Sequence, residues 1–272
     1  MSGFEMCCRA LHGEELTPEQ LKHLCDRDWI RNNARHIYKD KVNILAEIEV
    51  EINGVPQAVV IKLFGWRNRI SYWLSPFMRS RAKKSWDASF SLLKCGVKVP
   101  KPLTVYTQRR FGFIKCNFLL TEKIENFTLA RSWLRDPHAK PSDKRIIVET
   151  LAEMVRKMHQ AGMVHSDLTP GNFLINNNNP SEIYLIDLNR LKHKIFLTRS
   201  LKMDDVAKLN LCQCGFAEEH SDCLWIIFLE KYDKEEFEKN KLALRLAMRR
   251  LKNRRAMKSL RKSSKPKNLP TP

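Results

Sequence analysis

The fold is decided by Val164-His165-Ser166-Asp167-Leu168-Thr169-Pro170-Gly171-Asn172 and by the Tyr184-Leu185-Ile186-Asp187 that follows it. Apolar runs at 173–175 and 183–186 predict two short strands. Upstream, residues 146–158 carry apolar side chains at intervals of three and four, which predicts a helix. The polar residues of the stretch therefore lie on a loop between a helix and a strand, and at the end of the second strand.

These polar residues have the order that a kinase-like phosphotransferase needs. Asp167 would accept the proton of an attacking hydroxyl, while Asn172 and Asp187 would hold Mg²⁺ on the phosphates of a nucleotide. Carboxylate and amide oxygens are hard ligands that suit Mg²⁺. The alternative is that His165 is a packed histidine and that Asp167 and Asn172 shape a turn, because Pro170-Gly171 is turn chemistry. The ordered set and its apolar flanks favour the phosphotransferase.

A nucleotide-binding lysine is expected upstream, on a buried strand. The run Val59-Val60-Ile61-Lys62-Leu63-Phe64 has one lysine among apolar residues, like the V-A-I-K pattern. Burying Lys62 is costly unless an anion pairs with it, and the phosphates of ATP would be that anion. The alternative is an exposed lysine on an edge strand. Residues 44–52 alternate as a strand does and lead into Asn53-Gly54, so we predict a hairpin that delivers Lys62.

Two parts of such a site are altered. No Gly-rich phosphate loop precedes the hairpin, and we expect the cationic segment Arg35 to Lys41 to serve instead. The helix predicted at Arg81 to Cys95 contains no glutamate to pair with Lys62, and Asp87 is its one candidate.

The chain resembles the Kdo/WaaP lipopolysaccharide kinase family, a branch of the protein-kinase-like fold, over about residues 35 to 212. The motifs that carry the resemblance are Val60-Ile61-Lys62, Ser80 to Trp86 leading to Gly96 to Pro102, Leu120-Thr121-Glu122, His165 to Asn172, and Ile186 to Arg190. A basic helix with an embedded tryptophan, followed by Gly-Val-x-Val-Pro-x-Pro, is the most specific of them.

Members of this family transfer the γ-phosphate of ATP to sugars of the lipid A–core region of lipopolysaccharide. The resemblance implies that Lys62 contacts the nucleotide phosphates and that Asp167 is the catalytic base. It also implies Asn172 and Asp187 as Mg²⁺ ligands, with Glu122 in the hinge near the adenine. The expected partners are thus ATP, Mg²⁺ and a lipopolysaccharide acceptor.

The predicted fold is α+β, a bilobal protein-kinase-like fold. We expect a helical lead-in at 1–34, a β-rich N-lobe at 35–122 and a short helical C-lobe at 123–230. A basic amphipathic helix or tail would occupy 231–272. No internal repeat is present.

The net charge of +19 is concentrated near the C-terminus. Lys241 to Lys267 contains twelve Lys and Arg residues and no acidic residue, with apolar residues at helical spacing. Such a helix can lie on an anionic membrane surface, where each basic residue adds about 1 kcal/mol of attraction. A solvated tail and a nucleic-acid-binding helix are the alternatives.

A second basic and aromatic segment, Trp66 to Trp86, favours the membrane, because Trp and Tyr prefer the lipid interface. Some of its aromatic residues will be core, and we expect this of Trp86. A third basic group follows Asp187 and is positioned to hold an anionic acceptor: Arg190, Lys192, His193, Lys194, Arg199 and Lys202. We therefore expect contact with an anionic inner-membrane surface and no nucleic-acid partner.

Met1 to Arg9 lacks a secretory pattern, and the longest apolar run, Leu224 to Leu229, is too short to span a bilayer. The eight cysteines, among them Cys212-Gln213-Cys214, show no metal-ligand spacing, and we expect all of them to be reduced. The expected location is cytoplasmic, peripheral on the inner membrane.

The leading hypothesis is an ATP-dependent kinase acting on a sugar hydroxyl of the lipopolysaccharide inner core. An atypical protein Ser/Thr kinase of the RIO type is an alternative, although Thr169 stands where protein kinases commonly have a lysine. A membrane-bound pseudokinase is the third reading. A protein kinase regulated by an activation loop is disfavoured, because no D-F-G or A-P-E is present. Sequence does not specify the acceptor sugar or the oligomeric state.

Overall fold

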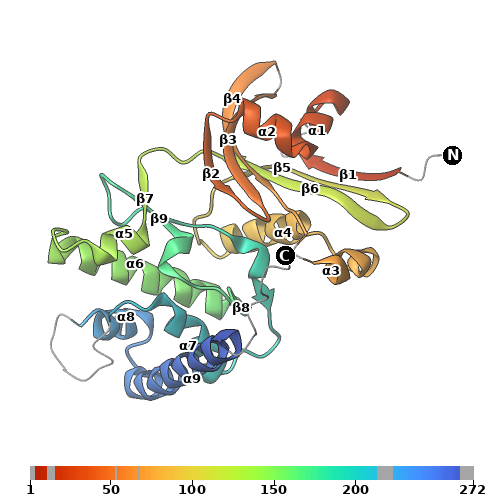
Figure 1. Ribbon diagram of the computed structural model, residues 1–272. Helices are drawn as coiled ribbons and strands as arrows, with labels where there is room; N and C mark the ends of the chain where they lie inside the picture. Colours follow the sequence, from red (N-terminus) through yellow and green to blue (C-terminus); the bar gives the residue numbers. More distant parts are fainter. Residues whose placement is uncertain (1–3, 11–15, 53, 67, 213–222, 264–272) are drawn as a thin grey trace, which may run out of the picture. The chain divides into compact units, whose positions relative to one another are not determined.

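The computed structural model describes residues 4–10, 16–52, 54–66, 68–212 and 223–263. These residues form two compact units (Figure 1). The first unit comprises Met1–Phe127 and Tyr184–Leu191, and the second comprises Thr128–Ile183 and Lys192–Pro272. The first contains the large sheet and the second is mainly helical, so the predicted α+β class is confirmed.

A six-stranded antiparallel sheet forms the first unit. Its strands are β1 (Phe4–Ala10), β2 (His36–Asp40), β3 (Ile44–Ile52), β4 (Val55–Leu63), β5 (Pro102–Arg110) and β6 (Phe113–Glu122), in the order β1-β5-β6-β4-β3-β2. The predicted hairpin is present, with Ile52 opposite Val55. Lys62 lies on β4, which is central, opposite Leu45 of β3 and Leu119 of β6. Lys62 is therefore not on an edge strand.

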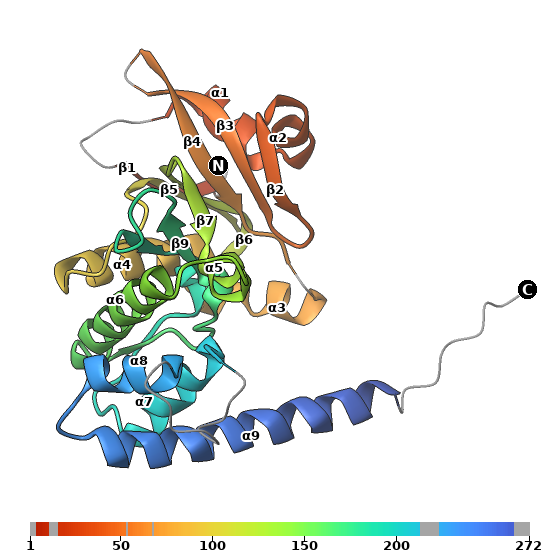
Figure 2. The ribbon, with the colours of Figure 1, turned by 90° about the vertical axis from the view of Figure 1, so that its left-hand side faces the viewer.

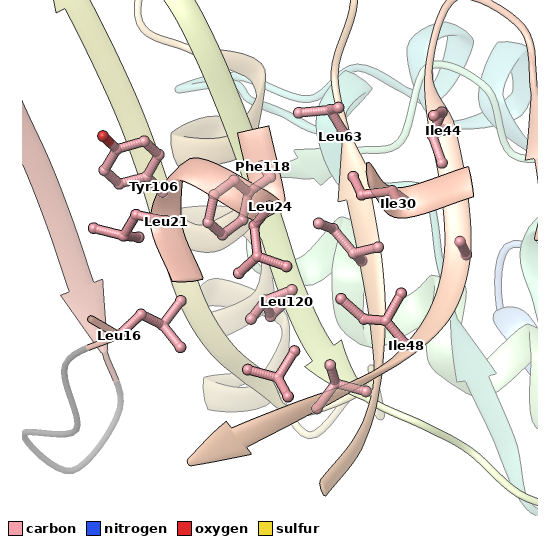
Figure 3. Close-up of a cluster of buried hydrophobic side chains, with 14 of the residues drawn as sticks. Leu16, Leu21, Leu24, Ile30, Ile44, Ile48, Leu63, Tyr106, Phe118 and Leu120 are labelled. Carbon is pink, nitrogen blue, oxygen red and sulfur yellow. The ribbon is translucent and has the colours of Figure 1, made fainter. Parts of the chain in front are cut away.

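Alternation along the strands gives the sheet two buried faces. Phe118 and Leu120 pack with Leu24 of α1 (Pro18–Cys25) and Ile30 of α2 (Arg27–Asn33), as Figure 3 shows. Leu119, between them, packs on the other face against α4 (Arg81–Lys94). Successive side chains of a strand point to opposite faces, which explains why a continuous apolar run is needed here.

The first unit differs from the sequence prediction at two places. Residues 4–10 form strand β1, paired with β5, whereas a helical lead-in was expected there; α1 and α2 follow it. Arg35 to Lys41 was expected to be a loop over the phosphates, but its residues 36–40 form strand β2 paired with β3. The connection between these strands is shorter, at 41–43. The sequence of residues 36–40 did not indicate a strand, because all five side chains are exposed and give no alternation of apolar residues.

Cys25 and Cys116 form a disulfide, with their Cα atoms 5.9 Å apart. The prediction that all eight cysteines are reduced is therefore wrong for this pair. The two residues are 91 positions apart in sequence, and packing of α1 against the sheet brings them together. In the second unit, the Sγ atoms of Cys212 and Cys223 lie 3.9 Å apart, while Cys214 lies outside the described residues.

The remaining elements of the first unit are α3 (Arg69–Trp73) and the short 3₁₀ turns η2 (Ser75–Phe77) and η4 (Leu188–Arg190). The short strands β7 (Phe127–Leu129) and β10 (Ile183–Leu185) lie at the points where the chain passes from one unit to the other. η4 packs against α4, and the backbone N–H of Leu185 donates to the carbonyl of Lys98 at 2.9 Å. These contacts fix the segment that carries Asp187.

The second unit is built around paired helices. Its elements are α5 (Ala130–Arg135), α6 (Pro141–Gln160), β8 (Met163–Val164), η3 (Pro170–Asn172), β9 (Phe173–Asn176), β11 (Lys192–His193), α7 (Arg199–Val206), η5 (Ala207–Leu209), α8 (Leu224–Tyr232) and α9 (Phe237–Ser263). α6 packs on α8, and His159 Nδ1 lies 2.9 Å from the Tyr232 hydroxyl within this contact. The predicted helix at 146–158 lies within α6.

The basic C-terminal segment forms the long helix α9, which lies beside α7 (Figure 2). Leu244 and Ala247 are buried, and Arg250 pairs with Asp204 of α7 at 2.7 Å. From residue 252 to 260 every side chain is exposed. Among the described residues, no helix combines the length and apolar character needed to cross a bilayer.

Candidate active site

Lys62 and Asp187, which are 125 positions apart, meet in the first unit. The Nζ atom of Lys62 lies 2.6 Å from Oδ1 of Asp187, and the Nδ2 atom of Asn189 donates to the same oxygen at 2.6 Å. Asp187 has a φ of +61°, in the left-handed region that non-glycine residues seldom adopt. Such backbone strain collects at functional sites. The sequence motif Ile186-Asp187-Leu188-Asn189 thus supplies both the carboxylate and the amide that orients it.

Lys62 is in a cationic environment. Burial lowers the pKa of Lys62, and the charges of nearby Lys39 and Arg81 lower it further, while Asp187 acts in the opposite direction. The Arg81 guanidinium also stacks over the Phe64 ring, 5.3 Å from its centroid. Three cations with one carboxylate make a site that favours a polyanion such as a triphosphate.

Among the described residues, Lys62 has no carboxylate partner on α4. Asp87 instead pairs with Arg79, which precedes α4, and with Lys83 of the same helix. Lys62 takes Asp187 as its carboxylate partner. The sequence had left Asp87 as the single candidate, and the local i,i+4 pair with Lys83 accounts for its charge.

The turn at 41–43 lies at the same end of the sheet as Lys62. The side-chain oxygen of Asn43 accepts from the backbone N–H of Gly65 at 3.3 Å and from Arg81 at 3.4 Å. A Cβ on Gly65 would lie 2.1 Å from the carbonyl oxygen of Val42, so only glycine fits there. This three-residue turn joins the two strands that precede the Lys62 strand, where a Gly-rich phosphate loop would be expected in a kinase.

Glu122 lies at the end of β6. Its carboxylate accepts from the backbone N–H of Lys101 at 2.8 Å, and its own N–H donates to the Lys101 carbonyl at 3.0 Å. Glu122 therefore joins the end of β6 to the Gly96–Pro102 segment. Its expected place beside an adenine remains a prediction.

Asp167 and Asn172 lie together on the loop of the second unit. The amide nitrogen of Asn172 donates to the carbonyl of Asp167 at 2.8 Å, and the Thr169 N–H donates to the same carbonyl at 2.8 Å. Because the amide nitrogen is used in this way, the Asn172 oxygen is the atom suited to a cation. His165 is fully buried, which agrees with the alternative that it is a packed histidine.

Sequence reasoning missed Asp205 of α7, which binds the backbone of this loop through hydrogen bonds. Its two carboxylate oxygens accept from the backbone N–H groups of His165 at 2.7 Å and Ser166 at 3.0 Å. Lys208 pairs with it at 2.9 Å and His159 lies 3.7 Å away. Burial alone would raise the pKa of Asp205, but these partners outweigh it and lower the pKa to about 2.

The backbone that Asp205 binds has an uncommon conformation. Ser166 has a φ of +63°, and its N–H is one of the two that Asp205 holds. The signal in the sequence was weak: an aspartate on the apolar side of a short helix, between Met203 and Val206.

Comparison with known proteins identifies the family of this chain. The profile of the lipopolysaccharide kinase (Kdo/WaaP) family matches residues 66–232, more than half of the chain. The chain belongs to this family. The predicted resemblance is therefore confirmed.

Two curated relatives show how far the similarity extends. The 3-deoxy-D-manno-octulosonic acid kinase of Vibrio cholerae serotype O1 is 30% identical over 129 residues, which cover 47% of this chain and 52% of the relative. The lipopolysaccharide core heptose(I) kinase WaaP of Escherichia coli K12 is 26% identical over 136 residues, covering 47% and 51%. The chain thus spans about half the length of the curated relatives it matches.

A solved structure supports the fold. The structure described as WaaP in complex with acyl carrier protein has a TM-score of 0.58 and 19% identity to this chain. The similarity covers 88% of this chain and 98% of that one. The protein-kinase-like fold of the Kdo/WaaP family is therefore the fold of this chain.

Each unit of this Kdo/WaaP member offers one oxygen donor of the kind that Mg²⁺ binds together with a nucleotide. Among the described residues, no group of three or more His, Cys, Asp and Glu side chains is arranged to hold a metal ion. Mg²⁺ typically uses one or two protein ligands together with phosphate oxygens and water. The carboxylate of Asp187 and the amide oxygen of Asn172 have this chemistry.

Proposed function

We propose that the chain is an ATP- and Mg²⁺-dependent kinase that phosphorylates a sugar hydroxyl of the lipopolysaccharide inner core, on Kdo or heptose. The observation that carries the proposal is the 2.6 Å contact between Lys62 and Asp187. It joins a half-buried lysine, whose side chain is 18% exposed, to the carboxylate of a motif far away in sequence, within a cationic environment. The named activities of the family's kinases support the same reaction class.

In this mechanism each residue has a separate task. Lys62 would bind the nucleotide phosphates, and Asp187 with Asn172 would hold Mg²⁺, which neutralises charge on the phosphates. Asp167 would accept the proton of the sugar hydroxyl and orient it for in-line attack on the γ-phosphate. Glu122 would mark the hinge near the adenine.

The test is transfer from γ-labelled ATP to purified lipid A–core acceptors, with Asp167→Asn as the paired variant. A general base contributes about 10²- to 10⁴-fold, so we expect transfer to fall by that factor while ATP binding, measured by calorimetry, is unchanged. Equal loss of binding and transfer would refute the role of Asp167. Label appearing only in the protein itself or in added proteins would favour the atypical protein kinase.

We further propose that the protein works at the inner face of the inner membrane. The most exposed apolar side chains described in the first unit lie near α3 and η2: Phe77 is 90% exposed, Phe111 76%, Ile70 70% and Trp73 65%. Arg109 ties the Phe111 turn to η2, donating to the carbonyls of Ser75 at 3.1 Å and Gly112 at 2.6 Å. Trp86, by contrast, is buried, as expected.

Apolar tips among basic residues are the composition of a surface that rests on anionic lipid. The second unit has a similar tip, Ile195 and Phe196, which are 94% and 84% exposed and lie between Lys194 and Arg199. Both surfaces, together with α9, would hold the enzyme where a membrane-anchored acceptor is displayed. Vesicle co-sedimentation tests this location.

A further inference from the structure

A pocket of about 210 Å³ lies beside the catalytic loop, within the second unit. Four of its lining residues are cationic, and none carries a carboxylate: Arg131 and Arg135 of α5, Lys208 of η5, and Arg255 of α9. Thr169 and Pro170 form the wall on the loop side. This pocket was not anticipated from the sequence, which pointed to the basic group after Asp187.

Among the described residues, little negative charge compensates the cations of the pocket. Lys208 pairs with Asp205. The same carboxylate also accepts two backbone N–H groups, so it neutralises Lys208 only in part. Within the described part of the chain, the structure gives Arg131, Arg135 and Arg255 no carboxylate within ion-pair distance. Three guanidinium groups gathered around one hollow repel each other unless an anion enters, so the arrangement favours anion binding.

The pocket is coupled to the proposed catalytic residue. A Cβ added to Gly171 would lie 2.6 Å from the Arg131 guanidinium, so this side chain rests directly on the loop. Thr169 is two residues from Asp167 and donates to its carbonyl at 2.8 Å. Two residues span at most about 7 Å, so the wall of the pocket at Thr169 lies within about 7 Å of the Asp167 backbone.

The chemistry of the pocket defines its ligand. Guanidinium groups bind carboxylate and phosphate oxygens through paired N–H donors. A volume of about 210 Å³ is below the range of pockets that enclose a whole drug-sized ligand, about 300–1,000 Å³, and suits one anionic group with part of its sugar.

We propose that this pocket is the anion subsite for the acceptor, holding a carboxylate or phosphate that the glycolipid carries next to the hydroxyl to be phosphorylated. The inference rests on the proposed function. It gives α9 a second role: besides meeting the membrane, this helix supplies Arg255 to the acceptor site. Acceptor choice would then depend on the position of an anion relative to the hydroxyl.

The experiment uses the full chain and a soluble, de-acylated lipid A–core oligosaccharide, so that membrane binding plays no part. The variants are Arg135→Ala, Arg255→Ala and their combination, with Arg254→Ala as the matched control, because Arg254 is the exposed neighbour that does not line the pocket. We expect each pocket substitution to raise the KM for the acceptor about tenfold, the effect of one partly exposed charged hydrogen bond. The KM for ATP and the thermal unfolding midpoint should stay unchanged, since these side chains are exposed.

Two modified acceptors identify the source of the anion. If the pocket binds a phosphate, the penalty of the double variant disappears on an acceptor treated with phosphatase; if it binds a sugar carboxylate, the penalty disappears when the carboxyls are reduced to alcohols. A penalty equal to that of Arg254→Ala on the native acceptor would overturn the inference while leaving the proposed function intact.

Binding of the same oligosaccharide, measured by calorimetry with a non-hydrolysable ATP analogue, provides a readout independent of turnover. Weaker binding by the double variant than by Arg254→Ala supports the subsite. If the unaltered chain neither binds nor phosphorylates the oligosaccharide, the proposed function itself is refuted and the subsite with it.

Discussion

Replacing Asp205 by asparagine tests the claim that this one buried carboxylate holds the loop that leads to Asp167. Asp205 is 2% exposed and accepts two backbone N–H groups, from His165 and Ser166. Asparagine has nearly the same volume but offers one acceptor oxygen and no charge. The backbone N–H of His165 or Ser166 then faces an NH₂ group, which cannot accept a hydrogen bond. Lys208 also loses its carboxylate partner.

The magnitude follows from the environment. Removing one partner of a buried ion pair costs about 3–5 kcal/mol, so we expect Asp205→Asn to lower the free energy of unfolding by that amount at pH 7. Part of it depends on pH. A pKa lowered from 3.8 to about 2 corresponds to about 2.4 kcal/mol. Because the folded-state pKa is the lower one, this stabilisation is complete above about pH 5 and is lost as the pH falls from about 4 to about 2.

The assay is urea denaturation at a series of pH values from 7 to 2.5, followed by fluorescence. Asp204→Asn is the control, because Asp204 is the adjacent residue of α7 but is partly exposed and pairs with Arg250. We expect it to cost less than about 1 kcal/mol. Asp205→Asn should flatten the acid side of the stability curve and reduce phosphate transfer. Equal losses in the two variants, or parallel pH curves, would refute the anchoring role.

Three further predictions concern the first unit. Lys62→Met should weaken ATP binding by about tenfold or more in calorimetry, since it removes the cation from the proposed phosphate site; unchanged binding would separate Lys62 from the nucleotide. Cys25→Ser should lower the free energy of unfolding by up to about 4–5 kcal/mol, because the bond to Cys116 closes a loop of 91 residues. This loss applies to the oxidised protein. In the reducing compartment that the proposed location implies, thiol trapping in cells should find the pair as thiols, and a trapped disulfide would contradict that location. Phe77→Asp should reduce co-sedimentation with anionic vesicles severalfold, whereas Val55→Asp, at another exposed apolar position, should not.

The amino-acid sequence determined the local parts of this protein. The strand pair that carries Lys62 was readable because alternation and the Asn53-Gly54 turn signal are short-range features. The order of Asp167, Asn172 and Asp187 led to the proposed kinase reaction, and the basic helix followed by Gly-Val-x-Val-Pro-x-Pro was the most specific sign of the family. Trp86 was correctly expected to belong to the core between helix and sheet.

Tertiary structure alone decided the contacts between distant segments. The Lys62–Asp187 pair, the Cys25–Cys116 disulfide and the grip of Asp205 on the loop join residues 125, 91 and 40 positions apart. No periodicity records such pairs, because each depends on how helices pack against a sheet or against other helices. The basic pocket is the clearest case. Its arginines come from α5 and α9, and each looks like an ordinary solvated charge until folding gathers them beside the loop.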